Sequence, residues 1–468
     1  MTELFSGFEL SARLRAVFAQ GRTRDLAWRR RQLRQLKRFL DECQREIAAA
    51  LASDLGKSAF ESQLTETGFV IGEIDYALRH LSSWNRSKRA PWSWRQGVAR
   101  AEVQVVPYGT VLILAPWNYP VQLALAPLVS ALAAGNCVIL KPSELAAASS
   151  ALLARRLPEY LDSEAVAIVT GGPETAAALV GLPPDYIFYT GGAAVGRKVM
   201  AAAATTLTPV TLELGGKSPC LVDATADIKV AARRIVWGKF LNAGQTCVAP
   251  DYVLAERRVL PVLTRACVRA IREFWGNDPK ASPDYGRIIN DRHFSRLCGL
   301  LRSGTVVIGG DCDAKERYLG PTILREVAWD SPVMQEEIFG PILPILPVES
   351  LAEAVTLVNS RPSPLALYLF SGSRQMRARV LAETRSGSVG LNDVIMQVTH
   401  HALPLGGVGE SGMGVCHGHA GFATFSQQRS VLEQSTLVDP ALRYPPYSRL
   451  AKWLLAGGKA ATPPQPPE

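Results

Sequence analysis

Residues 109–140 read GTVLILAPWNYPVQLALAPLVSALAAGNCVIL and contain no charged side chain. The stretch exceeds the roughly 20 apolar residues that a membrane-spanning helix needs, but three prolines and Asn118 interrupt it. It divides into an apolar strand, a proline-rich turn, an Ala/Leu helix, a Gly-Asn turn and a second apolar strand. We therefore expect a buried βαβ unit.

Strands and helices continue to alternate after this unit. The first half of the pattern has a helix from about 144, a strand at 166–169, a helix near 174–180 and a strand at 186–189. The second half, after Thr211, has helices near 226–241 and 258–275 and strands at 306–308, 341–347 and 365–370. Such alternation predicts an α/β protein with a doubly wound parallel sheet and a second α/β domain.

Length and composition restrict the class of protein. The 468 residues exceed the roughly 250–300 at which one hydrophobic core stops growing, so we expect several domains. With 47% apolar and 20% charged residues, bulk disorder is excluded. The net charge of +9 is modest for this length and does not indicate nucleic-acid binding. Eight cysteines without a C-x-x-C pair, and no secretory signal, predict a reduced, cytoplasmic compartment.

Cys247 is the first candidate for chemistry. It lies in FLNAGQTCVAP, residues 240–250, which predicts a loop between a helix and the next strand. A thiolate on such a loop can attack a carbonyl carbon. The alternative is a buried cysteine that acts as a small apolar side chain.

Glu213 is the second candidate, at the end of an apolar strand in TLELGGK, residues 211–217. A carboxylate between leucines is either a desolvated general base or an ion-pair partner of Lys217. The sequence leaves both alternatives open. The GGKS at 215–218 is not a phosphate-binding P-loop, because Thr211 stands where that motif requires its first glycine.

The sequence YTGGAAVG at 189–196 is a candidate nucleotide-binding turn between a strand and a helix expected at 197–204. Gly191, Gly192 and Gly196 stand where a backbone can approach a pyrophosphate at a helix N-terminus. A literal G-x-G-x-x-G begins at Gly407, but no helix is expected to follow it, so we interpret it as a loop.

Two further strand ends carry polar residues. Lys141 and Glu144, in KPSE at 141–144, either bind ribose hydroxyls or belong to an ordinary helix cap made by Ser143. Asn118, between two prolines, either donates its amide to an oxyanion or is a turn asparagine. The histidines have no spacing typical of a zinc site, and G-x-S-x-G is absent from the sequence.

Together these motifs resemble the aldehyde dehydrogenase superfamily from end to end. They occur in the order APWNYP, KPSE, TGG-x-x-x-G, ELGGK, GQTC, EEIFGP at 336–341 and LPLGGVGESGMG at 403–414. KSAFES at 57–62 is similar to the corresponding segment of the class 3 branch, and RYPPY at 443–447 resembles a segment of its 3B subgroup.

The resemblance implies NAD(P)-dependent oxidation of medium- to long-chain aliphatic and aromatic aldehydes to carboxylic acids. It makes Cys247 the nucleophile, Glu213 the general base, and Asn118 with the Cys247 amide the oxyanion hole. It assigns to the cofactor Trp117, Lys141, Glu144, Gly191, Gly192, Gly196, Glu337 and Phe339. We expect NAD to be preferred and NADP to be possible. The alternatives are a CoA-acylating dehydrogenase, which Glu213 disfavours, and a catalytically silent structural protein on the same fold.

The resemblance also implies a domain plan and a homodimer. The plan places a cofactor domain at 1–83 and 108–212, a catalytic domain at 213–404, a bridging or oligomerisation element at 84–107 and 405–440, and a tail at 441–468. The tail after Lys452 offers only WLLA, so we expect no membrane span, although peripheral membrane contact is possible.

Three positions depart from the pattern of the superfamily or of its class 3 branch. Gly192 replaces a common serine, which removes a hydroxyl near the phosphates. Val415 and His419 replace an arginine and a lysine, while His417 retains the histidine, so two cations near the substrate entrance or dimer contact are missing. We expect these departures to affect cofactor affinity and substrate scope.

Overall fold

The computed structural model describes residues 2–91, 99–439 and 443–455. Its chain forms two compact units, of which the first holds the residues up to Trp84 together with Val106–Gln427. The second unit holds Asn85–Val105 and the chain from Gln428 onward. Trp92, Trp94 and the proline-rich end of the sequence lie outside the described residues.

The βαβ unit expected from residues 109–140 is confirmed. Its two strands lie side by side in a six-stranded sheet with the order β17-β7-β6-β3-β4-β5. All described pairings in this sheet are parallel except that of β17 with β7. The strands are β3 (Thr110–Leu114), β4 (Cys137–Lys141), β5 (Val166–Ile168), β6 (Tyr186–Thr190), β7 (Val210–Glu213) and β17 (Gly412–Met413).

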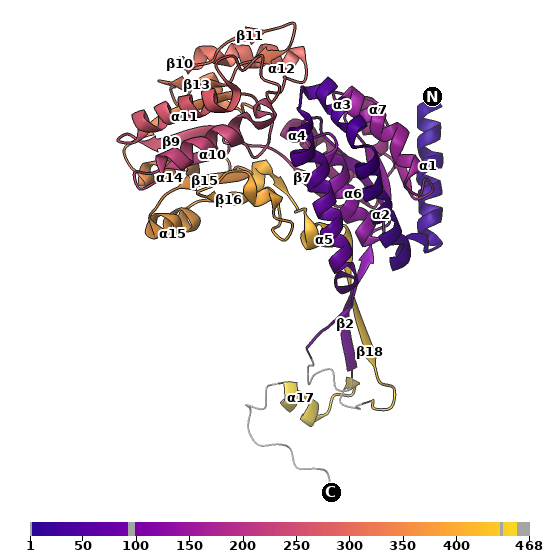
Figure 1. The fold of residues 1–468 in the computed structure, drawn as a ribbon. Helices are drawn as coiled ribbons and strands as arrows, with labels where there is room; N and C mark the ends of the chain where they lie inside the picture. The colour runs from indigo at the N-terminus through magenta and orange to yellow at the C-terminus, as the bar shows by residue number, and fades with distance from the viewer. Residues whose placement is uncertain (1, 92–98, 440–442, 456–468) are drawn as a thin grey trace. The chain divides into compact units, whose positions relative to one another are not determined.

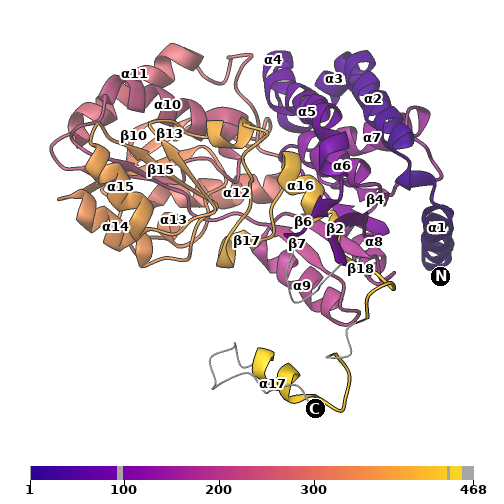
Figure 2. The ribbon, with the colours of Figure 1, turned by 90° about the horizontal axis from the view of Figure 1, so that it is seen from below.

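Helices cover both faces of the six-stranded sheet. On one face α6 packs with α2 and α5, and α7 packs with α3, whereas α1, α8 and α9 contact one another or the strands on the other face (Figure 2). The helices are α1 (Thr2–Ala19), α2 (Leu26–Glu42), α3 (Gln44–Leu55), α5 (Gly68–Trp84), α6 (Gln122–Ala134), α7 (Ala147–Arg156), α8 (Pro173–Val180) and α9 (Ala193–Ala204).

A second sheet of seven strands has the order β10-β13-β14-β9-β8-β15-β16 (Figure 1). It is parallel except for the antiparallel edge strand β10. The strands are β8 (Pro219–Val222), β9 (Tyr252–Glu256), β10 (Thr305–Ile308), β13 (Thr322–Arg325), β14 (Ile342–Val348), β15 (Ala366–Phe370) and β16 (Ser388–Leu391).

Alternate side chains of this sheet enter two separate hydrophobic cores. Val253 and Ala255 of β9 pack into the core that contains α10 and α11. Tyr252 and Leu254 of the same strand pack into the core that contains α12, α14 and α15. Because the side chains of a strand alternate between faces, this division shows a sheet covered by helices on both sides. The helices are α10 (Ile228–Phe240), α11 (Leu260–Trp275), α12 (Asp291–Leu300), α14 (Leu351–Asn359) and α15 (Arg374–Glu383).

Shorter elements connect these layers. The helical ones of the first unit are α4 (Ala59–Ser62), a π-helical turn (Gln63–Thr67), α13 (Pro332–Gln335), α16 (Gly418–Thr424) and 3₁₀ turns at Arg22–Arg24, Leu157–Glu159, Leu241–Gly244, Leu301–Ser303, Met396–Thr399 and Gly409–Ser411. A small antiparallel sheet pairs β11 (Cys312–Asp313) with β12 (Tyr318–Leu319).

The helix after the glycine turn begins earlier than the sequence predicts. We expected it at 197–204, but α9 already starts at Ala193, with Gly192 in extended conformation as its N-cap. Gly196 is therefore buried inside the helix, where an added Cβ would lie 2.9 Å from a methyl of Leu214. The smallness of Gly196 serves helix packing in this structure.

The second unit contains a three-stranded sheet of the order β1-β2-β18. Its elements are β1 (Lys88–Arg89), β2 (Ala99–Pro107), β18 (Ser426–Gln434) and α17 (Arg449–Leu455), the two longer strands extending by two residues into the first unit. Within the described part of the chain, no helix is both long and apolar enough to cross a membrane.

Candidate active site

Cys247 lies in the loop between α10 and β9, as the sequence predicts. The backbone that leads to it is unusual, because Asn242, Ala243 and Gly244 have φ angles of 53°, 50° and 75°. Left-handed conformations at residues other than glycine cost energy and are concentrated at functional sites. Half-buried Cys247 lines two cavities at once, one of about 660 Å³ and one of about 260 Å³.

The larger cavity is predominantly apolar. It is lined, among others, by Phe60, Leu64, Phe69, Trp237, Ile395 and Val398. Two imidazoles, those of His401 and His417, also line it. Such a cavity suits a ligand with an apolar chain whose reactive end reaches Cys247.

The smaller cavity collects most of the residues that the sequence analysis assigned to the site. Besides Cys247, these are Trp117, Asn118, Gly191, Gly192, Glu213, Glu337 and Phe339. Lys141 lies apart from this lining but on the same sheet edge, because it ends β4 opposite Leu114 at the end of β3. Glu144 pairs with Lys141, and Gly196 is buried in α9.

Glu213 ends β7 and is buried, with 6% of its surface exposed. Neither of its carboxylate oxygens has a hydrogen-bond partner. Burial raises the pKa of this carboxyl to about 8, and the neighbouring Cys416 thiol partly offsets the shift. Lys217 forms its ion pair with Asp251, so Glu213 is not held in a salt bridge with Lys217. Of the two alternatives that the sequence left open, the structure favours the desolvated base.

The surroundings of Cys247 disfavour the thiolate form of its side chain. Burial raises its pKa to about 12, and the nearby carboxylates of Glu337 and Glu213 contribute to the shift. A thiol in such a site needs a proton acceptor or an added positive charge before it can attack.

Asn118 is buried, and its side chain is hydrogen-bonded to the loop that carries Cys247. Its Nδ2 donates to the Gln245 carbonyl at 3.0 Å, two residues before Cys247. An amide carries two N–H donors, so one remains for a ligand in the smaller cavity. This geometry permits the oxyanion-binding role that the resemblance implied.

The smaller cavity has the features of a phosphate and ribose site. The backbone N–H groups at the start of α9 receive no side-chain cap, so this 12-residue helix presents free donors and a positive dipole end. A Cβ added to Gly215 would lie 2.0 Å from a Glu337 oxygen, which shows how closely the chain packs there. The uncapped start of α9 and the glycine turn are features that fit the phosphate groups of a dinucleotide.

Several residues at the two cavities were not predicted. His293 and Arg296 of α12 line the smaller one, where the His293 ring lies 5.1 Å from that of Trp117. His401 and His417 line the larger one and approach Glu73, with Nδ1–Oε1 distances of 2.8 and 3.7 Å. Nothing in the local sequence places His401 there, because its contact with Glu73 joins segments far apart in the chain. His417 stands in the motif that the resemblance placed near the substrate entrance or dimer contact.

The residues that depart from the family pattern, Gly192, Val415 and His419, lie in different environments. Gly192 faces open space, with no atom within 4 Å of an added Cβ. Val415 and His419 are exposed, whereas His417 is buried. No group of three or more potential metal ligands occurs in the described ranges.

Fold and site together define an α/β protein in which a cysteine lies between an apolar cavity and a cavity with a glycine turn, and comparison with known proteins gives its family. The sequence profile of the aldehyde dehydrogenase family matches residues 11–431. The solved substrate-bound state of AldH from Staphylococcus aureus superposes with a TM-score of 0.94 at 43% identity, covering 97% of this chain and 99% of that one. The chain belongs to the aldehyde dehydrogenase family.

Individual relatives narrow this to family 3. Aldehyde dehydrogenase family 3 member B1 of Homo sapiens is 50% identical over 448 residues, which are 95% of this chain and 96% of the relative. The dimeric NADP-preferring aldehyde dehydrogenase of Rattus norvegicus is 48% identical over 436 residues, which are 93% and 96% of the two chains. The protein is a family 3 aldehyde dehydrogenase that oxidises aldehydes with NAD(P)⁺.

Proposed function

We propose that the protein oxidises medium- to long-chain aliphatic and aromatic aldehydes to carboxylic acids through a covalent thioester on Cys247. The observation that carries this proposal is the position of Cys247. It is the reactive side chain shared by an apolar cavity, which suits the aldehyde chain, and a cavity with a glycine turn and the buried carboxylate of Glu213, which suits the cofactor and the attacking water.

The residues divide the reaction between them. The Cys247 thiol releases its proton to solvent as its sulfur bonds to the aldehyde carbon, and the π electron pair of the carbonyl moves onto oxygen. The free N–H of Asn118 and the Cys247 amide stabilise the negative charge that develops there. NAD(P)⁺, when bound, supplies the hydride acceptor. Glu213 then removes a proton from the water that attacks the thioester, which releases the acid and regenerates the thiol.

The unpaired state of Glu213 supports hydrolysis over transfer to coenzyme A. A carboxylate with a pKa near 8 is partly deprotonated at neutral pH and can accept a proton from water. An enzyme that passes its acyl group to a thiol has no need of a base for water.

The test replaces Cys247 by alanine and, as a control, the exposed Cys312 by alanine. We expect Cys247→Ala to lose aldehyde oxidation while its Kd for NAD⁺ stays within about twofold of wild type, because the nucleotide contacts lie elsewhere in the cavity. Cys312→Ala should turn over normally. Measurable turnover by Cys247→Ala at more than about one-hundredth of the wild-type rate would refute the proposal.

We further propose that NAD⁺ is preferred and NADP⁺ is also accepted. Lys141 is buried and paired with Glu144 at 2.7 Å, so an added 2′-phosphate would meet a carboxylate that already occupies the cation. The rat relative is named NADP-preferring, so the proposed preference for NAD⁺ would distinguish this chain from that relative. A kcat/KM at least tenfold higher with NADP⁺ than with NAD⁺ would reverse this proposal.

A homodimer is proposed because the rat relative, at 48% identity, is named dimeric. The expected result is a mass near twice the 50.6 kDa of the chain by light scattering at micromolar concentration. A mass equal to that of one chain would contradict it.

A further inference from the structure

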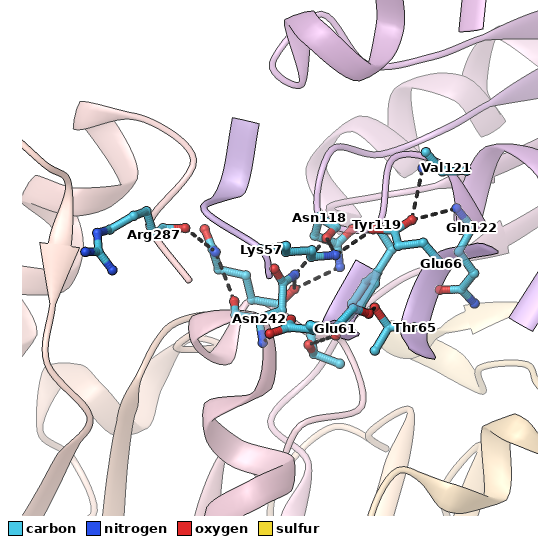
Figure 3. Close-up of polar contacts among 12 residues, drawn as sticks. Lys57, Glu61, Thr65, Glu66, Asn118, Tyr119, Val121, Gln122, Asn242 and Arg287 are labelled. Atoms are coloured by element: carbon cyan, nitrogen blue, oxygen red, sulfur yellow. Dashed lines mark hydrogen bonds and ion pairs between the residues drawn. The ribbon is translucent and has the colours of Figure 1, made fainter. Parts of the chain in front are cut away.

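A buried polar network surrounds the Asn118 turn beside the larger cavity, which Tyr119 and Thr246 help to line, and it takes no part in the steps described above. Figure 3 shows it reaching from the segment 57–66 to the Asn118 turn and on to Asn242. At its centre, the side chains of Lys57 and Glu66 have no exposed surface and pair at 2.5 Å. Burying two charges is costly, so a pair of this kind need not stabilise the fold more than apolar side chains of similar volume would.

Lys57 holds the Asn118 turn directly. Its ammonium donates to Glu66 and to the backbone carbonyl of Asn118, the latter at 3.2 Å. It also lies 3.9 Å from the ring centre of Tyr119, whose hydroxyl hydrogen-bonds to Thr246 at 2.6 Å. Thr246 immediately precedes Cys247. The Lys57 ammonium therefore contacts both the backbone of Asn118 and a ring, that of Tyr119, whose hydroxyl is hydrogen-bonded to the nucleophile loop.

Glu66 fixes the other end of the same turn. Its second oxygen accepts from the backbone N–H groups of Val121 and Gln122, at 3.1 and 2.7 Å. These residues open α6, where N–H groups lack partners within the helix. Glu66 itself lies in the π-helical turn Gln63–Thr67, a type of irregularity that is frequent at functional sites. The carboxylate therefore clamps the chain just after Asn118 while Lys57 clamps it at Asn118.

Asn242 completes the connection from the opposite side. Its Nδ2 donates to the Asn118 carbonyl at 2.7 Å and to the Gln245 carbonyl at 3.2 Å. Its own backbone N–H donates to Glu61 at 3.0 Å. These bonds hold Asn242 at its left-handed φ of 53° and join the Asn118 turn to the loop that carries Cys247.

We propose that the buried Lys57–Glu66 pair is a positioning device for the oxyanion hole, aligning the Asn118 amide with the Cys247 loop. The pair fixes both ends of a short turn through hydrogen bonds from fully buried charged groups, which are stronger and more directional than apolar contacts. A displacement of about 1 Å at such a donor can cost on the order of 10²-fold in rate. This inference rests on the oxyanion role proposed for Asn118.

The test uses Lys57→Met combined with Glu66→Gln, which removes both charges and keeps the side-chain volumes. The matched control is Lys37→Met with Asp75→Asn, an ion pair at 2.7 Å between α2 and α5 that is partly exposed. The rate of the first-turnover NADH burst is measured at saturating NAD⁺ and aldehyde. Its amplitude counts the active sites, so misfolded protein does not enter the rate.

We expect the burst rate per active site to fall roughly 10- to 100-fold in the Lys57/Glu66 variant and to stay unchanged in the control. The Kd for NAD⁺ should remain within about twofold in both. If the double variant gives no amplitude, the milder Glu66→Gln alone, which keeps an acceptor for the two N–H groups, should still slow the burst several-fold. An unchanged rate in a variant with measurable amplitude would overturn the inference.

A double-mutant cycle with Asn118→Ala decides whether the pair acts through Asn118. We expect Lys57→Met/Glu66→Gln to cause no further loss once Asn118→Ala is present. If the fold-losses in burst rate caused by Asn118→Ala and by Lys57→Met/Glu66→Gln multiply fully in the combined variant, the positioning role is overturned and Asn118 remains the oxyanion donor. If Asn118→Ala alone fails to slow the burst, the oxyanion role itself fails, and the inference fails with it.

Discussion

The two cavities that meet at Cys247 both have apolar walls, but only the smaller one is also lined by charged side chains. The larger has aromatic and aliphatic walls, and its described lining residues include no carboxylate and no lysine or arginine. The smaller is lined by Glu213, Glu336, Glu337 and Arg296 beside a glycine turn. Binding energy on the first side comes from buried apolar area, and on the second side from charge and backbone donors. Substitutions on the two sides should therefore change different kinetic constants.

The largest effect is expected at Glu213. Glu213→Gln should still form the thioester and one equivalent of NADH, because hydride transfer needs no base after the sulfur has added. Steady-state turnover should fall roughly 10²- to 10⁴-fold, the usual contribution of a general base. Stopped-flow absorbance at the NADH band separates the two phases. Steady-state turnover like wild type without any burst would contradict the role of Glu213.

Substitution of Asn118, the proposed oxyanion donor, should slow the NADH burst, whereas substitution of Glu213 should slow deacylation. Asn118→Ala should slow the burst itself by roughly 10²- to 10³-fold, as removal of other oxyanion donors does. The same stopped-flow experiment measures it, with cofactor affinity followed by fluorescence as a control. If only deacylation slowed, Asn118 would belong with Glu213 and the proposed division of steps would be wrong.

The pH profile provides a test of the smaller cavity without mutation. Burial raises the pKa of Glu213 to about 8, so the fraction of carboxylate, the basic form, increases as pH rises through that value. Where deacylation limits turnover, kcat should increase roughly tenfold from pH 7 towards a plateau above pH 9. The rise should be absent in Glu213→Gln. A kcat that falls over this range in the wild type would contradict a buried carboxylate as the base.

The apolar cavity predicts a dependence on chain length. Each CH₂ buried there contributes about 0.8 kcal/mol, or roughly a fourfold gain in kcat/KM, until the chain reaches the cavity mouth. A series of straight-chain aldehydes at fixed NAD⁺ concentration measures this slope. A flat series would show that the larger cavity does not hold the chain.

The smallest effect concerns Gly192. A serine fits its extended conformation, and no atom lies within 4 Å of the added Cβ. Its hydroxyl would add one donor beside the start of α9, so KM for NAD⁺ should fall about two- to fivefold with kcat unchanged, the worth of one modest hydrogen bond. An increase in KM would show that the space at Gly192 is needed by the cofactor.

Sequence patterns predicted the strands and helices well where their periodicity was strong. Residues 109–140 form the expected βαβ unit because an apolar strand and an Ala/Leu helix have few alternatives. The start of α9 was placed four residues late, because four small residues, Ala193 to Gly196, carry no periodic signal. Local pattern therefore predicts elements better than their ends.

Site residues were predicted from the sequence only where they stand in recognisable motifs. Cys247, Glu213 and Asn118 stand in recognisable motifs, and the structure gathers them around one cavity. The contact of Lys57 with Asn118 joins residues 61 positions apart, and that of His401 with Glu73 joins residues 328 apart. No local signal reports such contacts, because they arise from the packing of whole elements.

The covalent intermediate tests the central claim most directly. Glu213→Gln enzyme is mixed with NAD⁺ and an aliphatic aldehyde, quenched in acid, digested with trypsin and analysed by mass spectrometry. The peptide 240–257 contains Cys247 as its only cysteine. We predict that this peptide gains the mass of the acyl group. Acylation of a different cysteine, or an NADH burst without any acylated peptide, would contradict the account.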